Sequence, residues 1–421
     1  MEILLLRVDW CCEVPILKIH VRLRMKKLQV LFFLSVMICS LIYQWSFLRL
    51  SNAWGEESLE QIKQEAEKGN PEAEWELGEH YHRGQGVLKD DAIAFGWFEK
   101  SAHQGNAAAE GALAASYYSG RGIHSDIRKA VDWAKKGAVQ GDPRSMRYLA
   151  MFYDMEEVPG QANAVTWYRK AAELGDARAA YNLGTLYERG DDGLQKDYFK
   201  SAHWYRQAAE KGIPGAEIAL GDNYANGWGV PRDFSMTVKW YRKAADQGRE
   251  DAQYKMGFFY SIGFGGLPQN DLEAFNWYRK SAEQFNPRAI LAVALMYFNG
   301  RGIPQNLPKA AIWFQKAVGD METLDDRSGS MVGRDFEAAF YLGLCYERGL
   351  GVQKDYGKAI LLFRKLAELE DPDSEFELGD LYLRGKGVKK DEVKGLFWIK
   401  KSAAGGNGKA MSLLNFLHKV N

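Results

Sequence analysis

A tyrosine recurs nine times at nearly even spacing along this 421-residue chain. Its positions are Tyr81, Tyr117, Tyr153, Tyr187, Tyr224, Tyr260, Tyr297, Tyr346 and Tyr382. Successive tyrosines lie 34 to 37 residues apart, except for a spacing of 49 between the seventh and the eighth. A period of this length is typical of a helix pair that can bury its apolar face only against neighbouring copies. The chain is therefore expected to fold as a stack of repeats rather than around one compact core.

Three further positions recur with each tyrosine and predict the first helix of every repeat. An alanine or serine stands eight residues before the tyrosine, a leucine, methionine or valine four before it, and a glycine or alanine three before it. Residues at these spacings share one face of an α-helix. A Gly-x-Gly turn such as Gly84–Gly86 follows in most repeats and can end the helix in the left-handed conformation. Repeat three lacks this turn and has the sequence MEEVP at 155–159 instead.

A tryptophan marks the second helix of most repeats, with an alanine five residues later in most of them. These tryptophans are Trp97, Trp133, Trp167, Trp204, Trp240, Trp277, Trp313 and Trp398, and Leu362 takes the place in repeat eight. We expect the tryptophan and the alanine to face the neighbouring helices.

The combined pattern Ala-x3-Leu-Gly-x2-Tyr-x2-Gly-x-Gly-Val, followed by Asp and by Trp-Tyr-x2-Ala-Ala and Gly, resembles the Sel1-like repeat. Repeat five shows it well, from Ala216 through Tyr224 to Gly248. The resemblance covers residues 60–418 and implies an all-α, tetratricopeptide-like α-solenoid superhelix of about nine repeats. It also implies a scaffold or adaptor that binds other proteins. Some members have a disulfide in each repeat, which this chain does not.

The first 53 residues predict an export segment. Four basic residues between positions 22 and 27 precede a nearly continuous apolar stretch at 28–48, which is the pattern of a secretory signal. Ser51 and Ala53 are small residues suited to cleavage before Trp54. An uncleaved signal anchor is the alternative, because the apolar stretch is about long enough to span a bilayer. A further hypothesis is that translation starts at Met25, where a typical signal sequence begins.

The rest of the chain is expected to form one array. Residues 54–72 predict an N-terminal capping helix, and residues 73–421 the repeat solenoid. The wider spacing before repeat eight predicts an insertion near 319–335, either a tolerated surface loop or part of a binding site. Whether the segment is cleaved or stays as an anchor, its basic residues are expected to keep the amino terminus in the cytoplasm and the repeats to cross the membrane.

Neither charge nor motif indicates catalysis or nucleic-acid binding. Beyond residue 53, acidic residues outnumber basic ones by four, whereas nucleic-acid binders usually carry a basic excess. No Cys/His cluster has metal-ligand spacing, and the Gly-x-Gly turns follow helices and lack the ending of a phosphate loop. We therefore expect no catalytic residue, no metal, no cofactor and no enzymatic activity.

Partners of helical-repeat proteins usually bind the concave side of the array. We expect two positions of each repeat to face that side, namely those six residues and two residues before the repeat tyrosine. Their aromatic members suggest a groove for an amphipathic helix or an extended peptide. The candidate protein-binding residues are Trp75, Tyr181, Tyr254, Phe258, Phe340 and Phe376. The competing interpretation is that these side chains only pack neighbouring first helices together.

These observations predict an exported protein–protein interaction scaffold in the bacterial periplasm or cell envelope. Two alternatives stay open: a regulator that sequesters the extracytoplasmic domain of a sensor, and a secreted protein that contacts a host. The expected partners are other proteins, with membrane contact only through an uncleaved amino-terminal segment.

Overall fold

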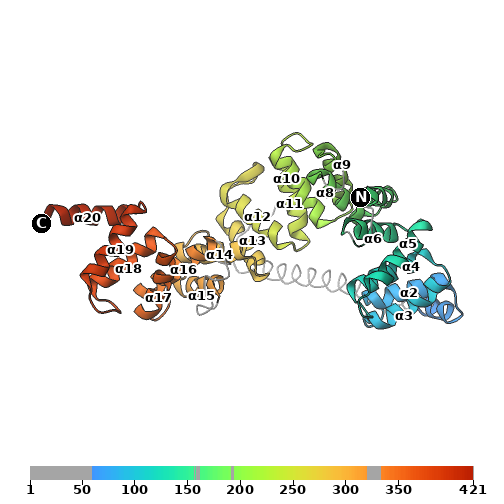
Figure 1. Cartoon of the computed structure of the whole chain (residues 1–421), viewed down its shortest axis with the longest axis horizontal. Helices are drawn as coiled ribbons and strands as arrows, with labels where there is room; N and C mark the ends of the chain where they lie inside the picture. The colour runs from blue at the N-terminus through green and yellow to red at the C-terminus, as the bar shows by residue number, and fades with distance from the viewer. Residues whose placement is uncertain (1–58, 156, 158–161, 191–193, 320–332, 421) are drawn as a thin grey trace, which may run out of the picture. The chain divides into compact units, whose positions relative to one another are not determined.

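The computed structural model describes residues 59–155, 157, 162–190, 194–319 and 333–420. Every regular element within these residues is a helix (Figure 1). The predicted all-α class is thereby confirmed. The predictions for residues 1–53, for a start at Met25 and for most of the insertion near 319–335 fall outside the described residues.

The chain divides into two compact units, Met1–Val158 and Pro159–Asn421. In the first unit, residues 59–67 are helical, and Leu59 and Ala66 pack against Ala73 and Leu77 of the next helix. The helices that follow are α2 (Pro71–Arg83), α3 (Asp91–His103), α4 (Ala107–Ser119), α5 (Ile127–Val139) and α6 (Pro143–Asp154).

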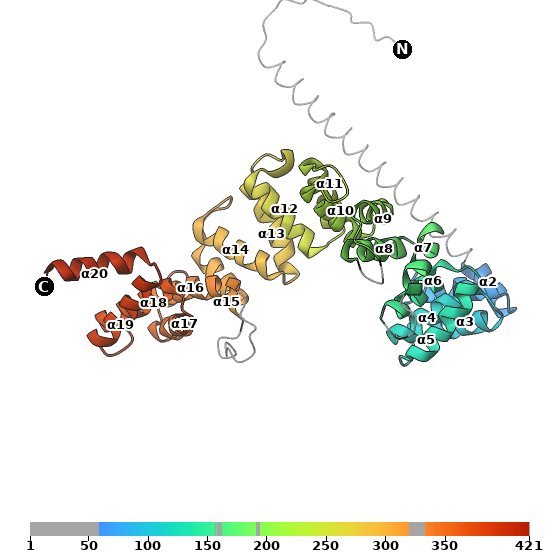
Figure 2. The same ribbon diagram turned by 45° about the horizontal axis from the view of Figure 1, so that its top comes forward.

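The second unit continues the alternation of first and second helices (Figure 2). Its elements are α7 (Ala162–Glu173), α8 (Ala177–Arg189), α9 (Tyr198–Glu210), α10 (Pro214–Asn226), α11 (Phe234–Asp246), α12 (Glu250–Ile262), the short 3₁₀ helix η1 (Phe264–Gly266), α13 (Asp271–Glu283), α14 (Pro287–Asn299), α15 (Leu307–Val318), α16 (Gly333–Arg348), α17 (Tyr356–Glu368), α18 (Pro372–Arg384), α19 (Glu392–Ala404) and α20 (Gly408–Val420).

The recurring positions of the first helix form the core, as the sequence predicts. The residues eight, four and three before the tyrosine are buried in all nine repeats. Small residues at two of these positions let the second helix of the repeat approach closely. At Gly257 of α12, an added methyl group would lie 2.6 Å from the ring of Tyr278 on α13. The backbone of the first helix therefore packs directly on an aromatic face of the second.

The repeat tyrosine also fixes the start of the second helix through its carbonyl oxygen. In every described repeat except the third, the backbone amide of the second helix's N-cap residue donates to this oxygen over 2.8–3.0 Å. The N-cap is Asp or Asn, and its side chain accepts from amides of the first turn, as at Asp233 and Asn270. A backbone bond and a side-chain cap thus set the angle between the two helices.

The second glycine of the turn is required by contact between repeats. Gly229 has φ 65°, a conformation that favours glycine. A methyl group there would also overlap the carbonyl group of Tyr198, at the start of α9 in the preceding repeat. The turn therefore closes α10 and packs on the previous helix pair at the same time.

The recurring tryptophans lie nearer to solvent than their place in the repeat pattern predicts. Trp240 and Trp277 are buried, but the other described members are only half-buried. A lysine three residues later covers many of these rings, with Lys243 Nζ 4.3 Å from the ring centre of Trp240 and Lys280 Nζ 4.2 Å from that of Trp277. The ammonium group gains a cation–π contact while the lysine stem shields the indole from water.

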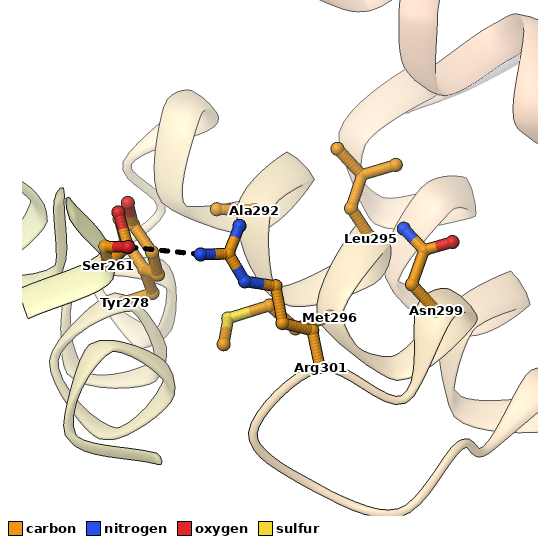
Figure 3. Close-up of a pocket in the computed structure, with 7 residues that line it drawn as sticks. All are labelled: Ser261, Tyr278, Ala292, Leu295, Met296, Asn299 and Arg301. Atoms are coloured by element: carbon orange, nitrogen blue, oxygen red, sulfur yellow. Dashed lines mark hydrogen bonds between the residues drawn. The ribbon is translucent and has the colours of Figure 1, made fainter. Parts of the chain in front are cut away.

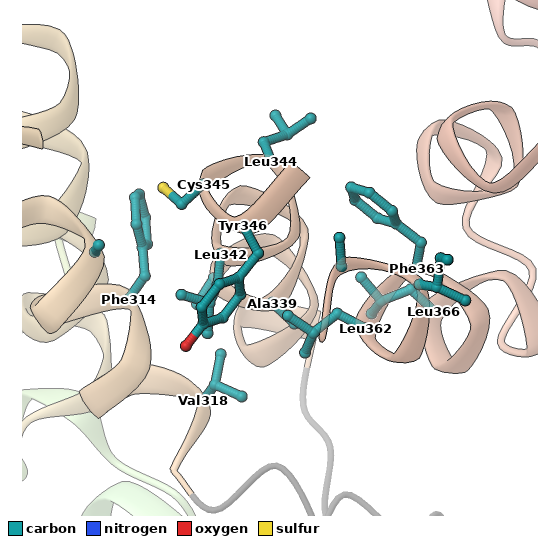
Figure 4. Packing of buried hydrophobic residues seen from close by; sticks show 14 of the residues in the cluster. Phe314, Val318, Ala339, Leu342, Leu344, Cys345, Tyr346, Leu362, Phe363 and Leu366 are labelled. Carbon is teal, nitrogen blue, oxygen red and sulfur yellow. The ribbon is translucent and has the colours of Figure 1, made fainter. Parts of the chain in front are cut away.

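The core continues across the widest spacing in the sequence (Figure 4). Phe314 and Val318 of α15 pack with Leu342 and Tyr346 of α16, and the same cluster extends to Phe363 of α17. None of the described helices of either unit combines the length and the apolar character needed to span a bilayer.

Candidate functional site

The six aromatic residues proposed from sequence differ in what they contact. Phe258 of α12 is 40% exposed, and the other five are half-buried. Tyr181 packs on Tyr205 with ring centres 5.8 Å apart. Phe340 packs on Tyr341 and Phe363, at 5.8 Å and 5.9 Å. Tyr254 likewise packs on Tyr278, with ring centres 5.5 Å apart. These contacts favour the packing interpretation for Tyr181 and Phe340, whereas Tyr254 also lines a cavity.

The remaining candidates at the two ends of the array have individual surroundings. The indole nitrogen of Trp75 on α2 is buried without a hydrogen-bond partner. The ring of Phe376 on α18 lies 5.8 Å from the ammonium group of Lys409 on α20. Neither residue lies in the two cavities described below.

Tyr254 lines a cavity of about 330 Å³ between the amino-terminal halves of three successive first helices, α10, α12 and α14. Its walls combine apolar and charged side chains: Ile218, Tyr241, Asp251, Tyr254, Lys255, Asn286, Pro287 and Arg288. Ile218 and Tyr254 both stand six residues before a repeat tyrosine. This position therefore lines an accessible cavity in repeats five and six.

A second cavity of about 230 Å³ lies between the carboxy-terminal halves of α12 and α14 (Figure 3). Arg301 is the one charged side chain in its walls, which are formed by Ser261, Tyr278, Ala292, Leu295, Met296, Asn299 and Arg301. Arg301 closes one side, because its guanidinium donates to the carbonyl oxygen of Ser261 over 3.0 Å and to Asp271 over 2.9 Å. Its charge is thus already balanced.

The two cavities share the same pair of helices. On α12, Tyr254, Phe258 and Ser261 occupy one helical face, and Phe258 stands between the two cavity-lining residues. On α14, Arg288, Ala292, Leu295 and Asn299 do the same. We call this surface the α12–α14 groove, made up of these seven residues and the two cavities at its ends.

The carboxylates at the amino end of the groove have partners. Tyr241 donates to Asp222 over 2.7 Å, and burial raises the pKa of Asp222 above its ordinary value. Burial also opposes ionisation of Asp251, but two hydrogen bonds from Arg249, at 2.8 Å and 3.2 Å, hold its pKa below the ordinary value. Asp251 is therefore charged at neutral pH and already paired.

The corresponding face of the first unit is crossed by an ion pair. Arg144 of α6 donates to Glu79 of α2 over 2.8 Å, although the two residues are 65 positions apart. Glu79 also pairs with Arg83 at 2.6 Å. Repeat two has Gly111 and Ala115 at the corresponding positions, and a methyl group added at Gly111 would collide with Asp142 and Ser145 at the start of α6.

Sequence reasoning missed the charged and small residues of the groove. Lys255, Arg288 and Ala292 do not stand at the positions chosen from the repeat pattern. A helical-wheel comparison of α14 alone would group Arg288 and Ala292 with Leu295, but it would not show that α12 leaves this face uncovered.

Nothing in the described residues forms a metal centre, since no group of three or more His, Cys, Asp or Glu side chains converges there. Burial raises the pKa of the Cys345 thiol to about 11. This cysteine packs in the core of α16.

Comparison with known proteins matches the Sel1 repeat model to nine segments, at residues 71–106, 107–142, 143–176, 177–213, 214–248, 250–284, 287–318, 336–371 and 372–407. A solved protective antigen of uropathogenic Escherichia coli, c5321, is 29% identical and covers 86% of this chain and 91% of its own, with a TM-score of 0.44. A Sel1 repeat protein from Oxalobacter formigenes is 31% identical over 55% of this chain and 96% of its own, with a TM-score of 0.46.

One curated relative, the chitin synthase regulator SKT5 of Malassezia restricta, is 41% identical over 66 residues. That match covers 16% of this chain and only 4% of the relative's length.

Proposed function

The chain belongs to the Sel1-repeat family, and from that premise we propose that it is an exported adaptor which binds a peptide segment of a partner protein in the α12–α14 groove. Sel1-repeat proteins generally mediate protein–protein interactions. The observation that carries the proposal is the pair of cavities along α12 and α14, with the 40% exposed Phe258 between Tyr254 and Ser261 on the same face of α12. Two side-chain pockets with a helical face between them suit a short peptide.

The size of the groove agrees with such a ligand. Ser261 stands seven positions after Tyr254, so these two lining residues are about 10 Å apart along α12 at about 1.5 Å per helical residue. An extended peptide advances about 3.3 Å per residue, so a segment of about three residues joins the cavities.

Export is supported by the sequence of residues 1–53, in which a basic segment precedes an apolar stretch and a cleavage motif. We propose that the repeats act in the bacterial periplasm or cell envelope. Fractionation of the native host followed by amino-terminal sequencing tests this step. A mature chain that begins at Trp54 in the envelope fraction supports it, and a full-length chain in the cytoplasm contradicts it.

The binding step is tested by photo-crosslinking in cells. A photoreactive phenylalanine analogue replaces Phe258 in one strain and Phe199 in another. Phe199 is the matched control, because it is an α9 phenylalanine that is 78% exposed and stands outside both cavities. A discrete adduct from position 258 but not from position 199 supports the groove. Equal labelling from both positions would show that exposure alone determines the adduct and would contradict the proposal.

A further inference from the structure

Two cations, Lys255 and Arg288, line the cavity at the amino ends of α12 and α14 without a salt bridge to any described residue. The charge of Lys255 favours the ionised form of the nearby Asp222, but the two side chains form no salt bridge. Arg288 has only a cation–π contact, 5.9 Å from the ring centre of Tyr254. In contrast, the carboxylates of Asp251 and Asp222 accept hydrogen bonds from Arg249 and Tyr241.

The cavity therefore offers a ligand free hydrogen-bond donors on cations but no unbonded carboxylate. Its anions are already bonded within the chain, whereas its two cations can each donate to a further acceptor. The amino end of α14 adds positive potential on the same side. Ile218 and Tyr254 supply an apolar wall next to the cations.

The cavity at the other end of the groove has no cation that lacks a salt bridge. Leu295, Met296 and Ala292 line it, and its one arginine, Arg301, is already bonded to Asp271 and Ser261. This end suits an uncharged, apolar side chain.

We infer that the α12–α14 groove recognises an acidic peptide segment, with an Asp or Glu side chain held by Lys255 and Arg288 and an apolar side chain about three residues away in the Leu295 cavity. This inference rests on the proposed function and adds the chemistry of the partner. A carboxylate bonded to an ammonium and a guanidinium group gains charge-assisted hydrogen bonds that an amide of the same shape does not.

The test uses the full chain and a positional-scanning library of N-acetylated, C-amidated octapeptides, so that no terminal charge contributes. The residues enriched at each position of the bound peptides are the readout. We expect Asp or Glu at one position and Leu, Met or Phe about three positions away. Replacing the selected acid by its amide should weaken binding about tenfold, and binding should fall with rising salt.

The variant Lys255→Glu/Arg288→Glu should lose the acidic preference and select Lys or Arg instead. The matched control is Arg128→Glu/Lys135→Glu, the same change of charge at two exposed residues of α5, and it should select peptides like the unchanged chain. Far-UV circular dichroism and thermal melting check that each variant folds. If the glutamates prevent folding, Lys255→Gln/Arg288→Gln replaces them and should abolish the preference.

Acidic enrichment that persists in the groove variant would overturn the inference, as would selection without an acid or no selection at all. In each of these outcomes, a crosslink from position 258 would still support the proposed function, because it does not depend on the charge of the partner. Loss of both results would mean that the groove is not a binding surface.

Discussion

The hydroxyl of Tyr260 accepts a hydrogen bond of 2.7 Å from the guanidinium of Arg242, which stands 18 residues earlier on the preceding second helix. The same relationship joins Arg169 to Tyr187, Arg206 to Tyr224 and Arg364 to Tyr382. In these four repeats the tyrosine hydroxyl bonds to the preceding repeat, while the tyrosine carbonyl oxygen accepts from the N-cap amide of its own second helix.

Replacing Tyr260 by Phe should lower the free energy of unfolding by about 1 kcal/mol, because it removes the acceptor for Arg242. Chemical denaturation measures the change. The control is Tyr297→Phe, since the equivalent Arg279 pairs with Glu283 instead, at 3.4 Å. A loss as large at Tyr297 would show that the hydroxyl bond is not the cause.

Gly257→Ala should destabilise the second unit by roughly 1–3 kcal/mol, because the new methyl group would lie 2.6 Å from the Tyr278 ring and α12 would have to move. Gly96→Ala is the contrasting change. Nothing lies within 4 Å of a methyl group at Gly96, so the gain in helix propensity should stabilise α3 by roughly 0.5–1 kcal/mol. Thermal melting of both variants decides whether the contact or the residue type matters.

Phe285→Gly should stabilise the chain. Phe285 follows α13 with φ 65° and is 83% exposed, so it bears the strain of a left-handed conformation and buries little surface. Glycine relieves that strain but loses more conformational entropy on folding. The net increase in the free energy of unfolding should be roughly 0.5–1 kcal/mol. Phe285→Ala retains the strained conformation and should leave the melting temperature nearly unchanged. A lower melting temperature for the glycine variant would show that the ring makes a stabilising contact.

The stability of the first unit should fall with acid through Glu79. Burial alone would raise its pKa, but the charges and hydrogen bonds of Arg144 and Arg83 hold the pKa below the ordinary value. A depressed pKa in the folded state stabilises the fold above the unfolded pKa, and this contribution is lost as the pH falls through the folded pKa. The unchanged protein should therefore have a larger free energy of unfolding than the Glu79→Gln variant at pH 7, and this difference should be smaller at pH 3. A constant difference would contradict the ion pair.

Cys345 should react slowly with thiol reagents in the folded chain. Burial raises its pKa to about 11, so little thiolate is present at pH 8, and the side chain is inaccessible. A variant with Cys11, Cys12 and Cys39 changed to Ser leaves this thiol to be followed alone. Reaction with an aromatic disulfide reagent should become fast only in denaturant. Rapid labelling of the folded protein would show that α16 opens locally.

Much of the fold follows from the sequence because each repeat is specified by local spacing. Leu220, Gly221 and Tyr224 share one helical face, and the counterparts of Leu220 and Gly221 are buried in every repeat. The N-cap Asp233 and the turn glycine Gly229 likewise act within one or two neighbouring helix pairs.

The groove could not be assigned in the same way. Tyr254 and Phe340 occupy the same position in the repeat, and each packs on an aromatic ring of the following helix, Tyr278 and Phe363. Tyr254 lines one of the two cavities as well, and Phe340 lines neither. The difference depends on how neighbouring helix pairs are offset and on which side chains fill the space between them. In the first unit Arg144 reaches across to Glu79, whereas Lys255 and Arg288 in the second unit form no salt bridge with any described residue.

The sequence by itself thus determined the number of repeats, the faces of their helices and the turns between them, because these depend on spacing within about 40 residues. Only the tertiary structure decided which of the equivalent groove-facing residues stay accessible. That choice depends on packing between three successive repeats, and a periodic pattern within one repeat does not encode it.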